Sequence, residues 1–190
     1  MGLIEYYEHT DEGETVWWNN TPEFREWLLG QMKWPIIVEP GGDRYYLGPY
    51  TGPGSLIIAQ PGDSENFYWH KGENYFFMHG GYDNVHLPKD TADIVMLNMV
   101  VSAIVGGNPT QIVLDTIEMA RRIASPGATL QILDGTTTLS TPVSELAKQG
   151  IPHEFRRLDM NDRVDRALCE HRSHDYAYLS DDLSLLVVPL

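Results

Sequence analysis

The chain has 190 residues, of which 42% are hydrophobic, and this is enough for one principal domain with a packed core. Its formal net charge of −14 argues against nucleic-acid partners, because the field around the protein repels polyanions. The single cysteine, Cys169, excludes an internal disulfide and a multi-cysteine zinc site.

Hydropathy and the N-terminal residues indicate the compartment. No run of about 18 apolar residues occurs, and Met1–Glu5 lacks the basic segment of a signal peptide. The sequence therefore predicts a cytoplasmic protein without a membrane segment, and its oligomeric state is not readable. Although the chain is acidic, a local basic patch stays open as an alternative. Its residues would be Arg156, Arg157, Arg163 and Arg166.

Residues 1–50 are predicted to form an N-terminal extension with one helix. Thr21-Pro22-Glu23 marks the helix start, because threonine caps, proline fits the first helical position and glutamate complements the dipole. A short β-branched run, residues 35–39, follows before Pro40-Gly41-Gly42. The Gly/Pro-rich stretch 48–54 is the best boundary, so we assign residues 51–190 to a second, α/β domain.

The second domain reads as short strands separated by turns and helices. Alternating strands and helices favour a mostly parallel sheet, and a closing hairpin adds antiparallel character, so we expect a mixed sheet. Asn108-Pro109 marks the start of the most clearly periodic helix. The predicted strands are 55–59, 75–78, 93–97 and 129–133, the helices 110–123 and 142–149, and the hairpin strands 175–179 and 183–188.

Two segments carry a family resemblance. His86–Asn98 resembles the "LP … D-x-V" segment of class I S-adenosylmethionine-dependent methyltransferases, and Leu114–Gly127 is similar to their following helix, which ends in Pro-Gly. The order of elements matches over residues 86–190, and residues 55–85 match loosely. The resemblance implies a Rossmann-like fold that binds S-adenosylmethionine and transfers its methyl group to a small molecule.

The resemblance also implies where the cofactor lies. Such enzymes have an acidic residue and a Gly-x-Gly turn after the first strand, where the backbone approaches the methionine part of the cofactor. We assign the first strand to Ser55–Ala59. The loop after it has one glycine and a proline, so we expect an abbreviated first half and a degenerate cofactor loop. The implied cofactor-binding residues are Gln60, Gly62, Asp63, Asp83, Leu97, Asn98 and Met99.

Several other residues invite a chemical role. Asp83 could bind the ribose hydroxyls, although Gly-Gly-Tyr-Asp is equally an ordinary turn. His171 and His174 lie near Cys169, but a zinc site would need a further ligand, so no metal ligand is assigned. Trp69 is a candidate for ligand or partner contact. The histidines that could act as a general base are His70, His79 and His86, and no catalytic residue is assigned.

Two functions remain open at this point. In the first, the chain is a methyltransferase that acts on a small molecule and works mainly by aligning acceptor and cofactor. In the second, it is a catalytically inactive member of the fold that binds another protein, through its acidic, Trp-rich N-terminal segment and its surface. The departure at the expected cofactor loop favours the second function, and the order of elements favours the first.

Overall fold

The structure is a computed structural model of the chain. It describes residues 4–9, 13–18, 30, 32–41, 54–60, 67–69, 75–85, 87–98, 100–104, 106–166 and 182–190. For residues 4–9, 13–18, 60, 67–69, 75–80 and 84 the backbone alone is described.

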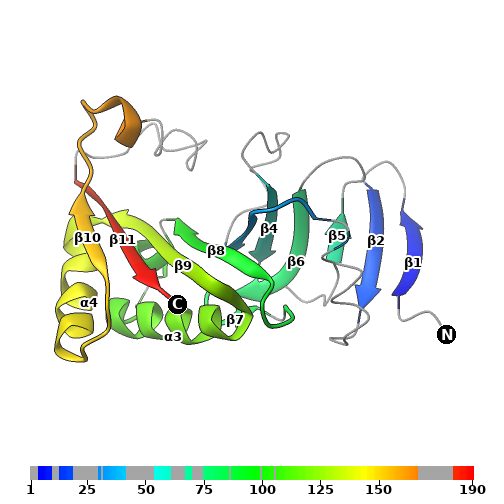
Figure 1. Ribbon diagram of the computed structural model, residues 1–190, viewed down its shortest axis with the longest axis horizontal. Helices are drawn as coiled ribbons and strands as arrows, with labels where there is room; N and C mark the ends of the chain where they lie inside the picture. Colours follow the sequence, from blue (N-terminus) through cyan, green and yellow to red (C-terminus); the bar gives the residue numbers. More distant parts are fainter. Residues whose placement is uncertain are drawn as a thin grey trace.

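A mixed β-sheet runs through the whole molecule (Figure 1). Its strand order is β1-β2-β5-β6-β4-β3-β8-β9-β11-β10. The five strands in the middle are mutually parallel, because β4 pairs with β6 and β3, and β8 pairs with β3 and β9. These strands are β3 (Ile36–Pro40), β4 (Ser55–Gln60), β6 (Tyr75–Gly81), β8 (Ala92–Asn98) and β9 (Ala124–Gly135).

Antiparallel strands extend the sheet on both sides. On one side β11 (Leu183–Pro189) pairs with β9, and β10 (Glu154–Arg157) pairs with β11. On the other side β5 (Phe67–Trp69) pairs with β6, and β2 (Gly13–Trp18) and β1 (Ile4–His9) follow. The short β7 (Asn84–Val85) folds back on the end of β6. The parallel strands therefore form the centre of the sheet.

Three described helices follow the parallel strands β8 and β9: α2 (Val100–Ala103), α3 (Pro109–Ile123) and α4 (Thr136–Lys148). The Asn108 side chain caps α3, because its Oδ1 accepts hydrogen bonds from the backbone N–H groups of Thr110 and Gln111. Figure 1 shows α3 running along the sheet beside α4. No helix in the described part of the chain is long and apolar enough to cross a membrane.

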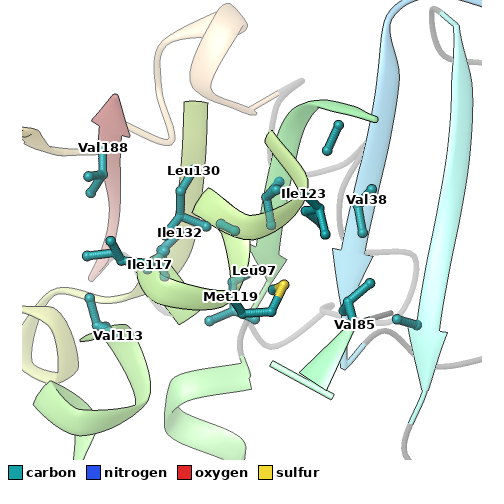
Figure 2. Packing of buried hydrophobic residues seen from close by; sticks show 14 of the residues in the cluster. Val38, Val85, Leu97, Val113, Ile117, Met119, Ile123, Leu130, Ile132 and Val188 are labelled. Atoms are coloured by element: carbon teal, nitrogen blue, oxygen red, sulfur yellow. The ribbon is translucent and has the colours of Figure 1, made fainter. Parts of the chain in front are cut away.

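The main hydrophobic core lies between α3 and the parallel strands. Figure 2 shows Val113, Ile117, Met119 and Ile123 of the helix packed towards the strands. The strand residues that it labels in this core are Val38, Val85, Leu97, Leu130, Ile132 and Val188. A smaller cluster on the other side of β3 and β4 contains Ile37, Leu56 and Ile58. Apolar residues on both faces are typical of central parallel strands.

The structure confirms the mixed α/β fold class and most of the predicted elements. Helix α3 begins one residue before the predicted start and ends at the predicted residue. Helix α4 begins at Thr136, because Leu139, one turn ahead of the predicted start at Pro142, is already buried in the core. The C-terminal strand β11 is antiparallel as expected, but its described partners are β9 and β10.

Some predicted elements lie outside the described residues. These are the predicted strand 175–179 and nearly all of the predicted N-terminal helix, of which Gly30 alone is described as helical.

The prediction of the first strand was wrong. Ser55–Ala59 does form a strand, but β3 precedes it and lies between β4 and β8. The five-residue run Ile36–Pro40 is short, yet Ile36 and Val38 are fully buried, as the centre of a sheet requires. The predicted boundary at residue 50 places this run in the N-terminal extension, whereas the structure places it at the centre of the sheet.

Candidate functional site

The parallel strands reverse their order at one place in the sheet. From β3 the chain continues to β4 and then β6 on one side, whereas β8 and β9 lie on the other side. After β3 and after β8 the chain thus continues to opposite sides of the sheet. In open α/β sheets, ligands bind at the carboxyl ends of the strands at such a switch point. The carboxyl ends of β3 and β8 are therefore the expected ligand position.

A hydrogen-bonded pair of polar side chains lies at this position. Glu39 is the penultimate residue of β3 and Asn98 is the last residue of β8. The Nδ2 of Asn98 donates to Oε1 of Glu39 at 2.8 Å. Because a carboxylate oxygen only accepts, this contact fixes the amide with its nitrogen towards Glu39 and its oxygen, Oδ1, away from it.

The free end of this pair is unsatisfied. Oδ1 of Asn98 is buried and has no hydrogen-bond partner within the described part of the chain. A buried acceptor without a donor costs roughly 1–3 kcal/mol, so native proteins retain few of them. The pair therefore presents a fixed acceptor that a ligand N–H or O–H group would satisfy.

Gly41 completes this edge of the sheet. It follows β3 directly, and its N–H donates to the carbonyl of Ala59 on β4 at 2.7 Å. Its φ of 74° lies in the left-handed region that favours glycine. A Cβ at this position would lie 3.2 Å from both Cγ atoms of Val100. The backbone of Gly41 and the side chain of Val100, the first residue of α2, therefore lie close together beside the Glu39–Asn98 pair.

The structure brings one of the predicted cofactor residues, Asn98, to this site. Leu97 is fully buried, and its side chain belongs to the hydrophobic core (Figure 2). Gln60 ends β4, and its side chain is not among those described. Gly62, Asp63 and Met99 lie outside the described residues.

Asp83 lies in the turn between β6 and β7. Its side chain is exposed, and its backbone carbonyl accepts a hydrogen bond from Nη2 of Arg122 in the last turn of α3. Burial of the adjacent Tyr82 raises the pKa of its phenol, and the nearby carboxylates of Asp83 and Asp115 raise it further. The ribose-binding role of Asp83 stays a prediction.

Sequence reasoning missed Glu39 and Gly41. The signal was present, because a β-branched run ends in an acidic residue and is followed by Gly41-Gly42. An acidic residue and glycines therefore stand where the family resemblance expects them after the first strand, although Gly41 and Gly42 are adjacent and do not form a Gly-x-Gly turn. The loop after Ser55–Ala59, which lacks the pattern, follows the second parallel strand. Its composition therefore does not bear on the first-strand motif.

The remaining candidates lie elsewhere in the fold or are not described by their side chains. Arg156 pairs with Asp165 at 2.7 Å and Arg157 pairs with Asp182 at 3.2 Å, so half of the predicted basic patch is matched by acids. Of the histidines singled out, His79 is described by its backbone alone. The others, together with Cys169, lie outside the described residues, and Trp69 has a described backbone only.

Solved structures resemble this fold over nearly its full length. The structure of the 16S rRNA methyltransferase KamB matches with a TM-score of 0.57 and 13% identity, covering 92% of this chain and 95% of that one. The 16S rRNA (adenine(1408)-N(1))-methyltransferase from Catenulisporales acidiphilia matches with a TM-score of 0.54 and 15% identity, covering 90% of this chain and 94% of that one. A SAM-dependent methyltransferase from Aquifex aeolicus matches with a TM-score of 0.51 and 14% identity, and 88% of each chain is covered.

At the level of sequence, no family model and no curated protein matches the chain. The structural likeness confirms the fold that the sequence motifs implied, the Rossmann-like fold of class I S-adenosylmethionine-dependent methyltransferases.

Proposed function

We propose that the chain binds S-adenosylmethionine at the carboxyl ends of β3 and β8 and transfers its methyl group to a small molecule. The observation that carries the proposal is the Glu39–Asn98 pair beside the left-handed Gly41, with a buried Oδ1 that has no partner among the described residues. This arrangement lies at the switch point of a methyltransferase-type fold.

The residues present fit the methionine part of the cofactor. That part carries a positively charged ammonium group, which needs hydrogen-bond acceptors. Oδ1 of Asn98 is such an acceptor, and the Glu39 carboxylate adds negative charge next to it. Gly41 has no side chain, and Val100 packs where one would lie, so the turn after β3 keeps its left-handed backbone next to the pair.

When bound, the cofactor supplies an electrophilic methyl group on a sulfonium. The chain then has to hold the cofactor, orient it towards the acceptor and exclude water from the site. Oriented reactants of this kind need no strong acid or base, because correct placement alone can supply several kcal/mol of the barrier. A site of acceptor groups and bare backbone is sufficient for that role.

A small molecule is the acceptor that the charge of the chain favours. With a net charge of −14, the protein repels phosphate-bearing polymers. Two arginines that could have formed a phosphate-binding surface, Arg156 and Arg157, are paired with aspartates. We therefore propose an uncharged or cationic acceptor, even though KamB and the Catenulisporales acidiphilia protein are 16S rRNA methyltransferases.

Calorimetric titration with S-adenosylmethionine and S-adenosylhomocysteine tests this proposal, because it needs no knowledge of the acceptor. We expect saturable binding in the micromolar range, about −8 kcal/mol. Asn98→Leu should weaken binding by about tenfold or more, since it removes the acceptor. Asn161→Ala changes an exposed turn residue elsewhere and is the matched control. Absence of binding at millimolar ligand would overturn the proposal.

A second candidate function is binding of another protein without catalysis. The observation that favours it is β1, which ends the sheet and has one neighbouring strand, β2, in the described part of the chain. An open strand edge can pair with an extended segment of a partner. Failure of cofactor binding, together with capture of a partner that is lost on deletion of residues 1–18, would favour this function.

A further inference from the structure

A buried carboxylate outside the Glu39–Asn98 pair borders the same edge of the sheet. Asp134 is fully buried near the end of β9. The register places Asn98 of β8 opposite Leu133, so Asp134 lies one residue beyond the level of Asn98. Its position is therefore at the carboxyl end of the strand adjacent to the site.

Both oxygens of this carboxylate are used. Oδ2 accepts the backbone N–H of Ser102 in α2 at 3.1 Å, and Oδ1 accepts the backbone N–H of Gly135 at 2.7 Å. The N–H of Ser102 belongs to the first turn of a helix, where no intrahelical acceptor is available. Asp134 thus ties α2 to the end of β9.

Helix α2 forms one wall of the site. It begins two residues after Asn98, and its first residue, Val100, contacts Gly41 so closely that a Cβ there would lie 3.2 Å from two of its carbons. A shift of α2 would therefore move Val100 relative to Gly41.

We propose that Asp134 is a positioning residue for the cofactor site. It holds α2 through the Ser102 N–H, and α2 in turn places Val100 against Gly41, next to the Glu39–Asn98 pair that would hold the methionine part of the ligand. The inference rests on the proposed function. Asp134 acts indirectly, because its carboxylate bonds to the backbone of Ser102 and Gly135.

Asp134→Asn is the direct test. An amide keeps one acceptor oxygen but replaces the other with a donor, so it can satisfy only one of the two N–H groups. We expect the Kd for S-adenosylmethionine to rise about tenfold. We also expect faster hydrogen exchange at residues 100–104, a readout that is independent of the ligand.

Asp93→Ala is the matched control. Asp93 lies at the opposite end of β8, where its Oδ2 accepts the N–H of Ile36 at 2.8 Å. Its loss also removes a carboxylate that binds a strand-end N–H, but far from α2. The control should lower the denaturation midpoint while leaving the Kd and the exchange of residues 100–104 unchanged.

A double-mutant cycle separates positioning from a general loss of stability. If Asp134 acts through α2, its effect on the Kd should be non-additive with that of Val100→Ala, whereas Asp93→Ala and Val100→Ala should be additive. Wild-type binding with an unchanged Kd in Asp134→Asn would overturn this inference and leave the proposed function intact. Absence of wild-type binding would overturn both.

Discussion

Gly41 shows how much depends on a single residue at the candidate site. Its left-handed φ of 74° makes any side chain unfavourable, and its contact with Val100 leaves no room for one. We expect Gly41→Ala to lower the free energy of unfolding by about 1–3 kcal/mol, from backbone strain and crowding together. Cofactor affinity should fall in the same variant, measured by calorimetry beside urea denaturation.

Gly127→Ala is the control for backbone strain. Gly127 has a similar φ of 84°, but no atom lies within 4 Å of an added Cβ. The variant should lose about 1 kcal/mol, from conformation alone, and should bind the cofactor as the wild type does. Equal losses of stability and affinity in the two variants would show that the contact with Val100 has no special role.

Asp165 gives the fold a predictable response to acid. The backbone N–H of Asp159 donates to its carboxylate at 3.0 Å and lowers its pKa, and the Arg156 guanidinium lowers that pKa further. A folded-state pKa below the unfolded value, near 3.9, stabilises the fold above that pH. This stabilisation is lost as the pH falls through the lower folded-state pKa.

Asp165→Asn should therefore be destabilised by about 1–2 kcal/mol at pH 7, and the difference from wild type should shrink as the pH falls below about 4. Urea denaturation between pH 7 and pH 3 measures this. Arg156→Gln keeps the Asp159 contact, so it should retain part of the pH dependence. A wild-type advantage that stays constant down to pH 3 would be at odds with the lowered pKa.

At the scale of elements, α3 is the helix on which the core depends, and its start is set by Asn108. Its side chain accepts from Thr110 N at 3.0 Å and from Gln111 N at 3.5 Å. Asn108→Ala should cost about 1 kcal/mol, whereas Asn108→Asp should cost little, because aspartate caps equally well. Thermal or urea denaturation of both variants checks this. A similar loss of stability in both variants would mean that the capping hydrogen bonds of Asn108 are not the cause of the effect of alanine.

The elements differ in how far they could be predicted from sequence. Helix α3 has a capping residue, a proline at its start and an apolar face, so its boundaries were found within one residue. Strand β3 has five residues and follows a proline, and nothing local shows that it pairs with β8, which lies more than fifty residues later. Strand order is a long-range property, and it was this order that located Glu39.

The site itself was half predictable for the same reason. Asn98 can be named as a candidate from sequence, because a strong apolar strand precedes it and the family resemblance implies cofactor residues at that strand end. Its partner Glu39 could be recognised only after β3 was known to lie beside β8. Asp134 depends on a third strand, and its bond to Ser102 spans 32 residues. Such contacts follow from packing rather than from local pattern.

At the scale of the whole molecule, the acidic charge is the property that bears on the acceptor. A protein that binds a nucleic-acid backbone gains affinity by releasing counterions, which requires clustered lysine and arginine. The chain has 13 basic against 27 acidic residues. Of the adjacent arginines, Arg156 and Arg157 each pair with an aspartate. The long-range field and the local pairing both oppose a phosphate-rich acceptor.

We therefore expect no saturable binding of a fluorescent RNA hairpin up to about 10 μM protein at 50 mM salt, with or without cofactor, because the electrostatic term that supplies most non-specific affinity has the wrong sign. Fluorescence anisotropy measures this. Since Asp165→Asn and Asp182→Asn release Arg156 and Arg157 from their ion pairs, the double variant shows whether local pairing alone suppresses binding. RNA binding by the wild type that weakens steeply with salt would reveal a basic surface strong enough to overcome the net charge. It would then make nucleic acid the acceptor class to test first.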